Sequence, residues 1–247
     1  MSSSLKILVK FPSRGRPEQF LKVLRMMVEM STIPESIHYL VSIDTDDESM
    51  RGGIITRASA ICNAITFVYG ASKTKIEAIN RDMSFTSEWD IVLLASDDML
   101  PQVKGWDEVI RKAFGEETVN EISTSEAWTS LDNNVGNGRL ISSSPNLDQA
   151  LWFFDGHQHR ICTLIVMGKK RYEKFGYLYH PSYISLWCDN EWTGVNQPKK
   201  FEQILFKHEH PAWGGGVPND ALYVRNEAYF ERDRMNFEKR KQLNFPI

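Results

Sequence analysis

Residues 89–99 read WDIVLLASDDM and join a strongly apolar run to two adjacent aspartates. The four aliphatic residues from Ile91 to Leu94 are typical of a strand buried on both faces, as in the centre of a parallel sheet. Asp97 and Asp98 follow that strand directly. Ligands of open α/β sheets bind beyond the carboxyl ends of the strands, and paired carboxylates there suit a divalent cation shared with phosphate oxygens. The stretch therefore predicts a metal-dependent enzyme acting on a nucleotide or diphosphate substrate.

The first half of the chain alternates between apolar strands and amphipathic helices. Short aliphatic and β-branched runs predict strands over residues 5–9, 37–43, 65–69 and 89–95. Apolar residues at helical spacing predict helices over residues 17–28, 72–83 and 106–113. This alternation is typical of an α/β fold with a mostly parallel central sheet flanked by helices. Beyond about residue 120 the periodicity weakens, and a charged helix is expected over residues 226–241.

Composition and charge exclude several classes of protein. The chain has 247 residues, of which 42% are apolar, and this is enough for a large core. A net charge of −3 argues against a broadly basic surface for nucleic acids. The three cysteines show no zinc-binding spacing, so we expect reduced thiols. Because no apolar leader and no membrane-spanning run is visible, the sequence predicts a soluble, cytoplasmic protein.

Clusters of polar residues follow three of the predicted strands, at residues 13–16, 44–47 and 96–98. Because the carboxyl ends of parallel strands lie at one edge of a sheet, we expect the clusters to converge on one crevice. Arg14 and Arg16 would pair there with a diphosphate through forked hydrogen bonds. Taken alone, the two arginines are equally consistent with a solvated turn. Asp97 and Asp98 could also form an acidic turn that caps the following helix, although this alternative is the weaker one.

The order of these motifs resembles that of GT-A-fold glycosyltransferases, most closely family 2. The resemblance covers residues 5–115 in order and the remainder more loosely. It is carried by a strand, the turn from Pro12 to Pro17, Asp44, the segment from Gly70 to Asn80, and the strand-end acids after Leu94. It implies a GT-A-like, Rossmann-like fold that binds a nucleotide sugar.

The resemblance also implies a metal site and a nucleotide site. Asp98 would be the main ligand of Mn²⁺ or Mg²⁺ and Asp97 its partner. One departure is Ala95, which stands where many members of the family have a further acid. The residues that would bind the nucleotide or the donor sugar are Ser13, Arg14, Arg16, Asp44, Lys75 and Asn80.

Histidines offer a replacement for the missing acid. His208 and His210 lie two residues apart, on one face if the segment is extended. Imidazole suits manganese better than magnesium, and some GT-A enzymes are similar in bringing a C-terminal histidine to the metal. Loop histidines are also commonly just solvated. His157 and His159 form a second candidate pair.

A general base is expected in residues 186–192, where Asp189 and Glu191 lie among aromatic residues. Partial burial raises the pKa of a carboxyl group, and a carboxylate can take the proton from an attacking hydroxyl. Family 2 enzymes place an acid pair at about this distance after the metal motif. By that likeness Asp189 is the expected base and Glu191 the second candidate, although Asp189 also suits a helix cap.

Together these features predict one GT-A-like domain over residues 1–247. Residues 1–118 would bind the nucleotide sugar, residues 119–225 the acceptor, and residues 226–247 would form a helical tail. The expected reaction transfers a sugar, with inversion, from a UDP-sugar to a hydroxyl of a glycan, a protein, a small molecule or a modified DNA base. Two alternatives stay open: a sugar-nucleotide nucleotidyltransferase, and a non-catalytic relative that binds nucleotides or sugars.

Overall fold

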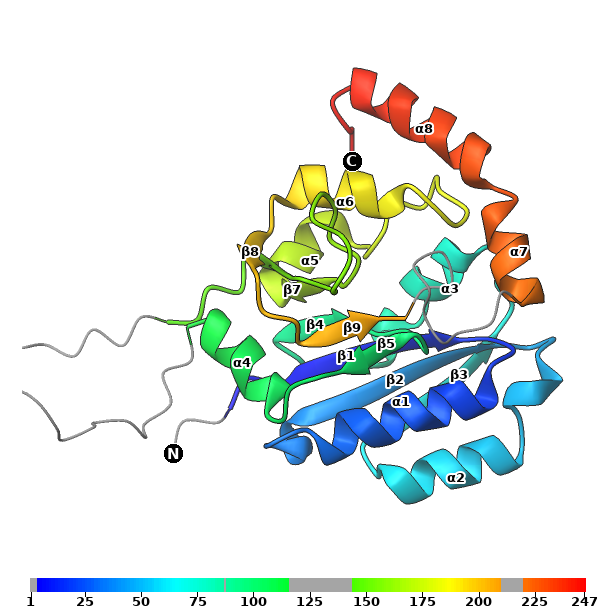
Figure 1. The fold of residues 1–247 in the computed structure, drawn as a ribbon, viewed down its shortest axis with the longest axis vertical. Helices are drawn as coiled ribbons and strands as arrows, with labels where there is room; N and C mark the ends of the chain where they lie inside the picture. Colours follow the sequence, from blue (N-terminus) through cyan, green and yellow to red (C-terminus); the bar gives the residue numbers. More distant parts are fainter. Residues whose placement is uncertain (1–3, 87, 116–143, 210–219) are drawn as a thin grey trace, which may run out of the picture.

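The computed structural model describes residues 4–86, 88–115, 144–209 and 220–247, and its centre is a seven-stranded sheet (Figure 1). The strand order is β3-β2-β1-β4-β7-β6-β8. The strands are β1 (Ile7–Ser13), β2 (Ile37–Asp44), β3 (Ile65–Gly70), β4 (Ile91–Leu94), β6 (Ala150–Phe153), β7 (Val166–Gly168) and β8 (Lys199–Phe201). The strands from β3 to β4 are parallel, and β7 runs antiparallel to β4 and β6. The predicted α/β class with a mostly parallel sheet is therefore confirmed.

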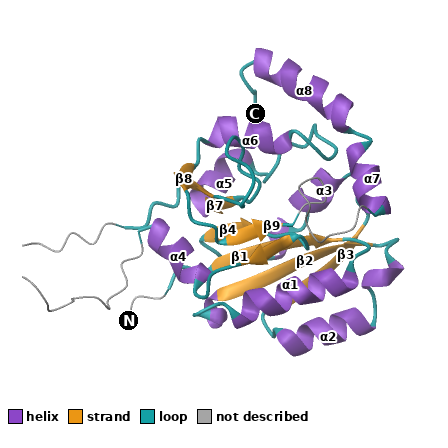
Figure 2. Ribbon diagram, in the orientation of Figure 1, coloured by secondary structure: helices purple, strands orange, loops and turns teal. Residues whose placement is uncertain are grey.

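Helices cover both faces of the sheet (Figure 2). They are α1 (Pro17–Glu29), α2 (Gly53–Ile61), α3 (Lys75–Asn80), α4 (Trp106–Ala113), α5 (Lys169–Phe175), α6 (Cys188–Asn196), α7 (Ala221–Glu227) and α8 (Phe230–Gln242). Successive side chains of a strand point to opposite faces, so Ile7 and Val9 pack into the core beneath α1 and α2, whereas Leu8 packs into the core beside α3 and α6. All four residues of β4 are buried, as predicted for a central strand.

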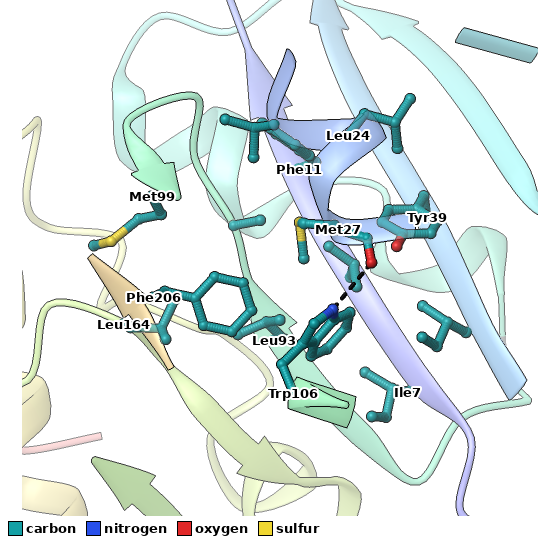
Figure 3. Close-up of a cluster of buried hydrophobic side chains, with 14 of the residues drawn as sticks. Ile7, Phe11, Leu24, Met27, Tyr39, Leu93, Met99, Trp106, Leu164 and Phe206 are labelled. Atoms are coloured by element: carbon teal, nitrogen blue, oxygen red, sulfur yellow. Dashed lines mark hydrogen bonds between the residues drawn. The ribbon is translucent and has the colours of Figure 1, made fainter. Parts of the chain in front are cut away.

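Trp106 anchors α4 to the first core (Figure 3). Its side chain is fully buried, and its indole N–H donates a hydrogen bond of 3.0 Å to the carbonyl oxygen of Met27. The ring also meets Phe206 edge to face, with 5.4 Å between the ring centroids. The contact joins α1, α4 and the C-terminal half of the chain.

The boundaries of two elements differ from those predicted. Strand β1 continues to Ser13, past Pro12, because its pairing with β4 ends at Lys10 and the missing N–H of Pro12 therefore breaks no hydrogen bond on that side. Helix α3 is shorter than the predicted 72–83, since Thr74 caps its start and Asp82 has a left-handed φ of 71°.

Several elements have no counterpart in the prediction, among them strands β6, β7 and β8 and helices α5 and α7. Helix α2 was not predicted. A second, two-stranded sheet pairs β5 (Met99–Pro101) with β9 (Phe206–His208), with Met99 opposite His208. The predicted C-terminal helix is present as α8.

Across the described ranges no helix has the length and apolar character needed to cross a bilayer.

We predict that Trp106→Ala lowers the free energy of unfolding by about 3–5 kcal/mol, because it opens a cavity and leaves the Met27 carbonyl without its donor. Urea denaturation followed by circular dichroism measures this. Phe85→Ala is the control, since that side chain is 64% exposed, and its effect should stay within about 0.5 kcal/mol. Equal losses in the two variants would contradict the anchoring role of Trp106.

Candidate active site

A cleft of about 530 Å³ lies at the carboxyl ends of β1, β2 and β4. The strand ends contribute residues of all three polar clusters, among them Ser13, Asp44 and Asp98. The opposite wall is formed by residues 184–190, which lead into α6, and the segment containing α7 lines a further side. The parallel strands thus bring together clusters that are far apart in sequence.

Two carboxylates flank His208 at one end of this cleft. The antiparallel pairing of β9 with β5 places His208 next to the strand-end acids. Its Nε2 lies 3.4 Å from Oδ2 of Asp98, and its Nδ1 lies 3.7 Å from Oδ2 of Asp155. Ser96 donates a further hydrogen bond to Asp98, so the position of that carboxylate is fixed from two sides.

The carboxylates hold a proton on His208. Burial lowers the pKa of the imidazole, but Asp155 and Asp98 outweigh burial and raise that pKa to about 9. Burial in turn raises the pKa of Asp98, and His208 outweighs this and keeps it below the ordinary value for an aspartate. At neutral pH the cluster is therefore an imidazolium between two carboxylates.

Arg14 links two of the strand ends. Its guanidinium donates to Asp44 at 2.7 Å and to both oxygens of Asp46 at 2.5 and 2.8 Å. Hydrogen bonding to Asp46 is the main reason why the pKa of Arg14 lies above its ordinary value. The turn that follows β1 is thereby held against the end of β2.

Arg16 lies between two carboxylates. It donates to Asp97 at 3.0 Å and to both oxygens of Asp220 at 2.6 and 2.9 Å. Burial and the neighbouring charge of Asp98 raise the pKa of Asp97 to about 6, although Arg16 acts in the opposite direction. Asp220 also caps α7 by accepting a hydrogen bond from the backbone N–H of Tyr223 at 2.9 Å. Arg16 therefore ties the C-terminal segment to the strand ends.

Asp189 lines the opposite wall, at the start of α6. Burial raises the pKa of its carboxyl group, and the positive charge of Lys75 opposes this shift. Its Oδ1 accepts a hydrogen bond of 2.9 Å from the backbone N–H of Asn190. A carboxyl group of raised pKa that faces a cleft is a candidate proton acceptor.

Most of the predicted site residues line this one cleft. They are Ser13, Arg14, Arg16, Asp44, Lys75, Asp97, Asp98, Asp189 and His208. His210 lies outside the described residues, as does the predicted boundary between residues 118 and 119.

Two predicted residues have structural partners instead of facing the cleft. The side chain of Asn80 bonds the backbone of Leu178 and Tyr179. Glu191 is buried and accepts hydrogen bonds from Arg240 at 2.7 and 2.8 Å and from the hydroxyl of Tyr183 at 2.7 Å. Because its carboxylate is already neutralised, Glu191 is poorly placed to act as a base.

The sequence reasoning missed Asp155 and Asp220. Asp155 closely follows the apolar run of β6, so it had the same strand-end signal as Asp98. Asp220 had no such signal, because its role depends on Arg16 at the other end of the chain. The histidine pair at residues 157–159 does not line the cleft, and the ring of His159 stacks on Phe154.

Several buried polar atoms of the cleft make no hydrogen bond to the residues that the structure describes. They are Oδ1 of Asp44, Oγ of Ser72, Oγ of Ser185 and Nε1 of Trp187. Buried polar groups in folded proteins are nearly always hydrogen-bonded. Unpaired atoms gathered in one cleft therefore indicate that the cleft takes a polar ligand.

Two solved structures with a similar fold cover most of this chain. The mannosyltransferase PcManGT from Pyrobaculum calidifontis, in complex with GDP-Man and Mn²⁺, matches 87% of this chain with a TM-score of 0.61 and 10% identity. TarS 1-349 from S. aureus matches 83% with a TM-score of 0.54 and 8% identity. The chain has a GT-A fold.

The likeness to these GT-A structures is one of fold. The chain spans 59% of the length of the PcManGT chain and 60% of the TarS chain. No protein-family model matches the sequence, and no curated protein sequence does.

The cleft contains residues that could bind a divalent metal ion whose remaining ligands come from a bound substrate. Asp98 and His208 supply a carboxylate and an imidazole, a donor set that suits Mn²⁺. Within the described ranges no group of three His, Cys, Asp or Glu residues is arranged to hold a metal ion. Two protein ligands suffice when diphosphate oxygens and water complete the coordination.

We predict that His208→Gln destabilises the metal-free protein in a pH-dependent way. The pKa of His208 is about 9 in the fold and ordinarily 6.5. Its ion pairs therefore stabilise the fold fully below about pH 6.5, by about 3 kcal/mol at most, and this contribution is lost as the pH rises through about 9. Urea denaturation in EDTA, from about pH 6 to about pH 10, gives the difference between variant and wild type.

The control for this experiment is His159→Gln. Within the described part of the chain, the ring of His159 stacks on Phe154 and forms no ion pair, so this variant shows the effect of removing an imidazole ring without removing an ion pair. A difference for His208→Gln that is constant across the range, or that grows with pH, would rule out the proposed ion pairs.

Proposed function

We propose that this chain is a metal-dependent glycosyltransferase. The donor is a nucleotide sugar, with a UDP-sugar expected first, and the sugar is transferred to a hydroxyl with inversion at the anomeric carbon. The observation that carries the proposal is the meeting of Asp98, His208 and Asp189 in one cleft of a GT-A fold. The complex of the mannosyltransferase PcManGT with GDP-Man and Mn²⁺ supports the class of donor and the ion.

The nucleoside and the diphosphate of the donor would lie over the strand ends. Oδ1 of Asp44 is buried there, 3.9 Å from Nη2 of Arg81, and accepts no hydrogen bond from the described residues, which suits a ribose hydroxyl or a base N–H. Arg16 and Lys75 would face the phosphates. Lys75 lines the cleft, where its positive charge already acts on Asp98 and Asp189 and would also attract an anion.

Asp98 and His208 would hold Mn²⁺ or Mg²⁺ beside the same phosphates. When bound, the ion acts as a Lewis acid that offsets the charge on the departing diphosphate. Asp155 would orient His208 through the other ring nitrogen, as carboxylates commonly do for metal-binding histidines. Because His208 is protonated in the metal-free protein, ion binding should release a proton.

Asp189 would act as the general base. It would take the proton from the acceptor hydroxyl while the hydroxyl oxygen attacks the anomeric carbon and the bond to the diphosphate breaks. Its raised pKa strengthens it as a proton acceptor. Trp187, beside it in the same wall, offers an aromatic face and an unpaired N–H to the sugar or the acceptor.

We predict that Asp98→Ala weakens binding of the donor nucleotide at least ~100-fold, because the ion that bridges protein and diphosphate loses a charged ligand. Calorimetry with UDP, GDP, CDP and dTDP, each with Mn²⁺ and with EDTA, measures this. Asp148→Ala, at a partly exposed surface aspartate that pairs with Lys174, should bind like wild type. Failure of the folded wild-type chain to bind any of the four nucleotides would overturn the proposal.

We predict that Asp189→Asn keeps nucleotide binding and lowers the rate of sugar transfer ~10²–10⁴-fold, because only the base is lost. Transfer is measured as release of the nucleoside diphosphate with glycan, protein, small-molecule and hydroxymethylated-DNA acceptors. Glu173→Gln, an exposed change on α5, serves as the control. Full turnover by Asp189→Asn would show that another group takes the proton.

The reaction products also distinguish a glycosyltransferase from the two alternative functions. Release of pyrophosphate instead of the nucleoside diphosphate would identify a nucleotidyltransferase. Metal-dependent binding without turnover on any acceptor would identify a non-catalytic relative.

A further inference from the structure

A buried carboxylate binds the backbone of the cleft wall that contains Asp189. Asp233, on α8, has no exposed surface. It accepts hydrogen bonds from the backbone N–H groups of Ser185 at 2.7 Å, Leu186 at 2.9 Å and Ile184 at 3.1 Å. Three successive N–H groups therefore converge on one side chain that lies far along the chain.

The residues held by Asp233 lead directly to the proposed base. Residues 184–186 line the cleft and are followed by Trp187, which has a left-handed φ of 61°, and then by α6 with Asp189 in its first turn. A left-handed backbone is unfavourable for a large side chain and persists only where the surroundings enforce it. The hydrogen bonds to Asp233 supply that constraint on one side of Trp187.

Aromatic and ionic contacts join the same two elements. The ring of Trp187 lies 5.6 Å from that of Phe230 and 5.4 Å from that of Phe237, both on α8. One turn into α6, Glu191 pairs with Arg240 of α8. Helix α8 thus contacts the chain on both sides of Asp189, at Trp187 and at Glu191.

We propose that Asp233 is a positioning residue for Asp189: it fixes residues 184–186 so that the carboxyl group at the start of α6 faces the reacting atoms. This inference rests on the proposed function for the role of Asp189 as the base. An aspartate suits the position because a carboxylate has only acceptors. The amide of an asparagine would turn a donor toward the backbone N–H groups and leave part of the loop without a partner.

The chain offers a matched control in Asp107. This aspartate is also fully buried, lies on a helix, and accepts hydrogen bonds from two successive backbone N–H groups, those of Thr32 at 2.8 Å and Ile33 at 2.9 Å. No residue of α4 lines the cleft. Each aspartate also pairs with an arginine, Asp107 with the buried Arg111 and Asp233 with the exposed Arg232. Asp107→Asn therefore makes the same substitution, at a buried ion pair of its own, outside the wall that contains Asp189.

The experiment compares wild type, Asp233→Asn and Asp107→Asn by amide hydrogen exchange and by steady-state kinetics. In Asp233→Asn we expect exchange of residues 184–186 to become at least ~10-fold faster. We expect kcat to fall ~10–100-fold, while the Kd for the nucleotide with Mn²⁺ changes less than ~2-fold. In Asp107→Asn the faster exchange should be confined to residues around 32–33, and kcat should stay within ~2-fold of wild type.

Several results would overturn the inference. Unchanged exchange of residues 184–186 in Asp233→Asn, or faster exchange with an unchanged kcat, would exclude a positioning role. An equal loss of kcat in both variants would show only general destabilisation. If Asp233→Asn does not fold, hydrogen exchange of the wild-type chain provides the test. The inference requires the amides of residues 184–186 to exchange far more slowly than those of an exposed loop, and fast exchange would overturn it.

Failure of the proposed function is separable from failure of this inference. If the wild-type chain transfers no sugar, the role of Asp189 falls, and hydrogen exchange alone decides whether Asp233 fixes the loop. If the wild-type chain is active and the loop is unaffected by Asp233→Asn, the proposed function stands and this inference fails.

Discussion

The position of strand β1 between β2 and β4 is the constraint on which the cleft depends. Parallel pairing on both sides sets Ser13 beside Ile43 and Lys10 beside Leu94. Each strand therefore ends at the same edge of the sheet, and the polar residues that follow them share one space. Because both faces of β1 and β4 are buried, a shift of register by one residue would move every side chain into the opposite core, where its size and shape no longer fit. The packing of the two cores thereby fixes the geometry of the charged residues.

The two halves of the chain contribute different parts of the candidate site. The first half supplies the strand ends, with arginines that are already paired to aspartates. The second half supplies His208, Asp189 and Asp220, and each is positioned by a contact between residues distant in sequence. The pairing of β5 with β9 positions His208, the packing of α8 on α6 positions Asp189, and the ion pair with Arg16 positions Asp220. The site is an assembly of both halves, although each half alone forms part of the same sheet.

Much of the fold and part of the site could be predicted, because their signals are local. Residues 91–94 are four consecutive aliphatic residues, which indicates a strand buried on both faces. Asp97 and Asp98 follow them closely in the sequence. The spacing of the histidines and the family resemblance predict His208 beside Asp98. The strands that bring the two residues together have three residues each, too short to show a period. The surroundings of Glu191 and Asn80 were not predictable, because their partners, Arg240 and the backbone of Tyr179, are remote in sequence.

The pairing of β5 with β9 also bears on how the protein is made. Asp98 leaves the ribosome before His208 and Asp233, which follow it at a long distance in the sequence. Contacts between such distant residues form late, since the intervening loop must close before they can be made. During translation, the strand ends of the first half are therefore present for a long interval with their carboxylates and without the histidine. The candidate site of this protein can therefore be completed only after the segment with His208 has been synthesised.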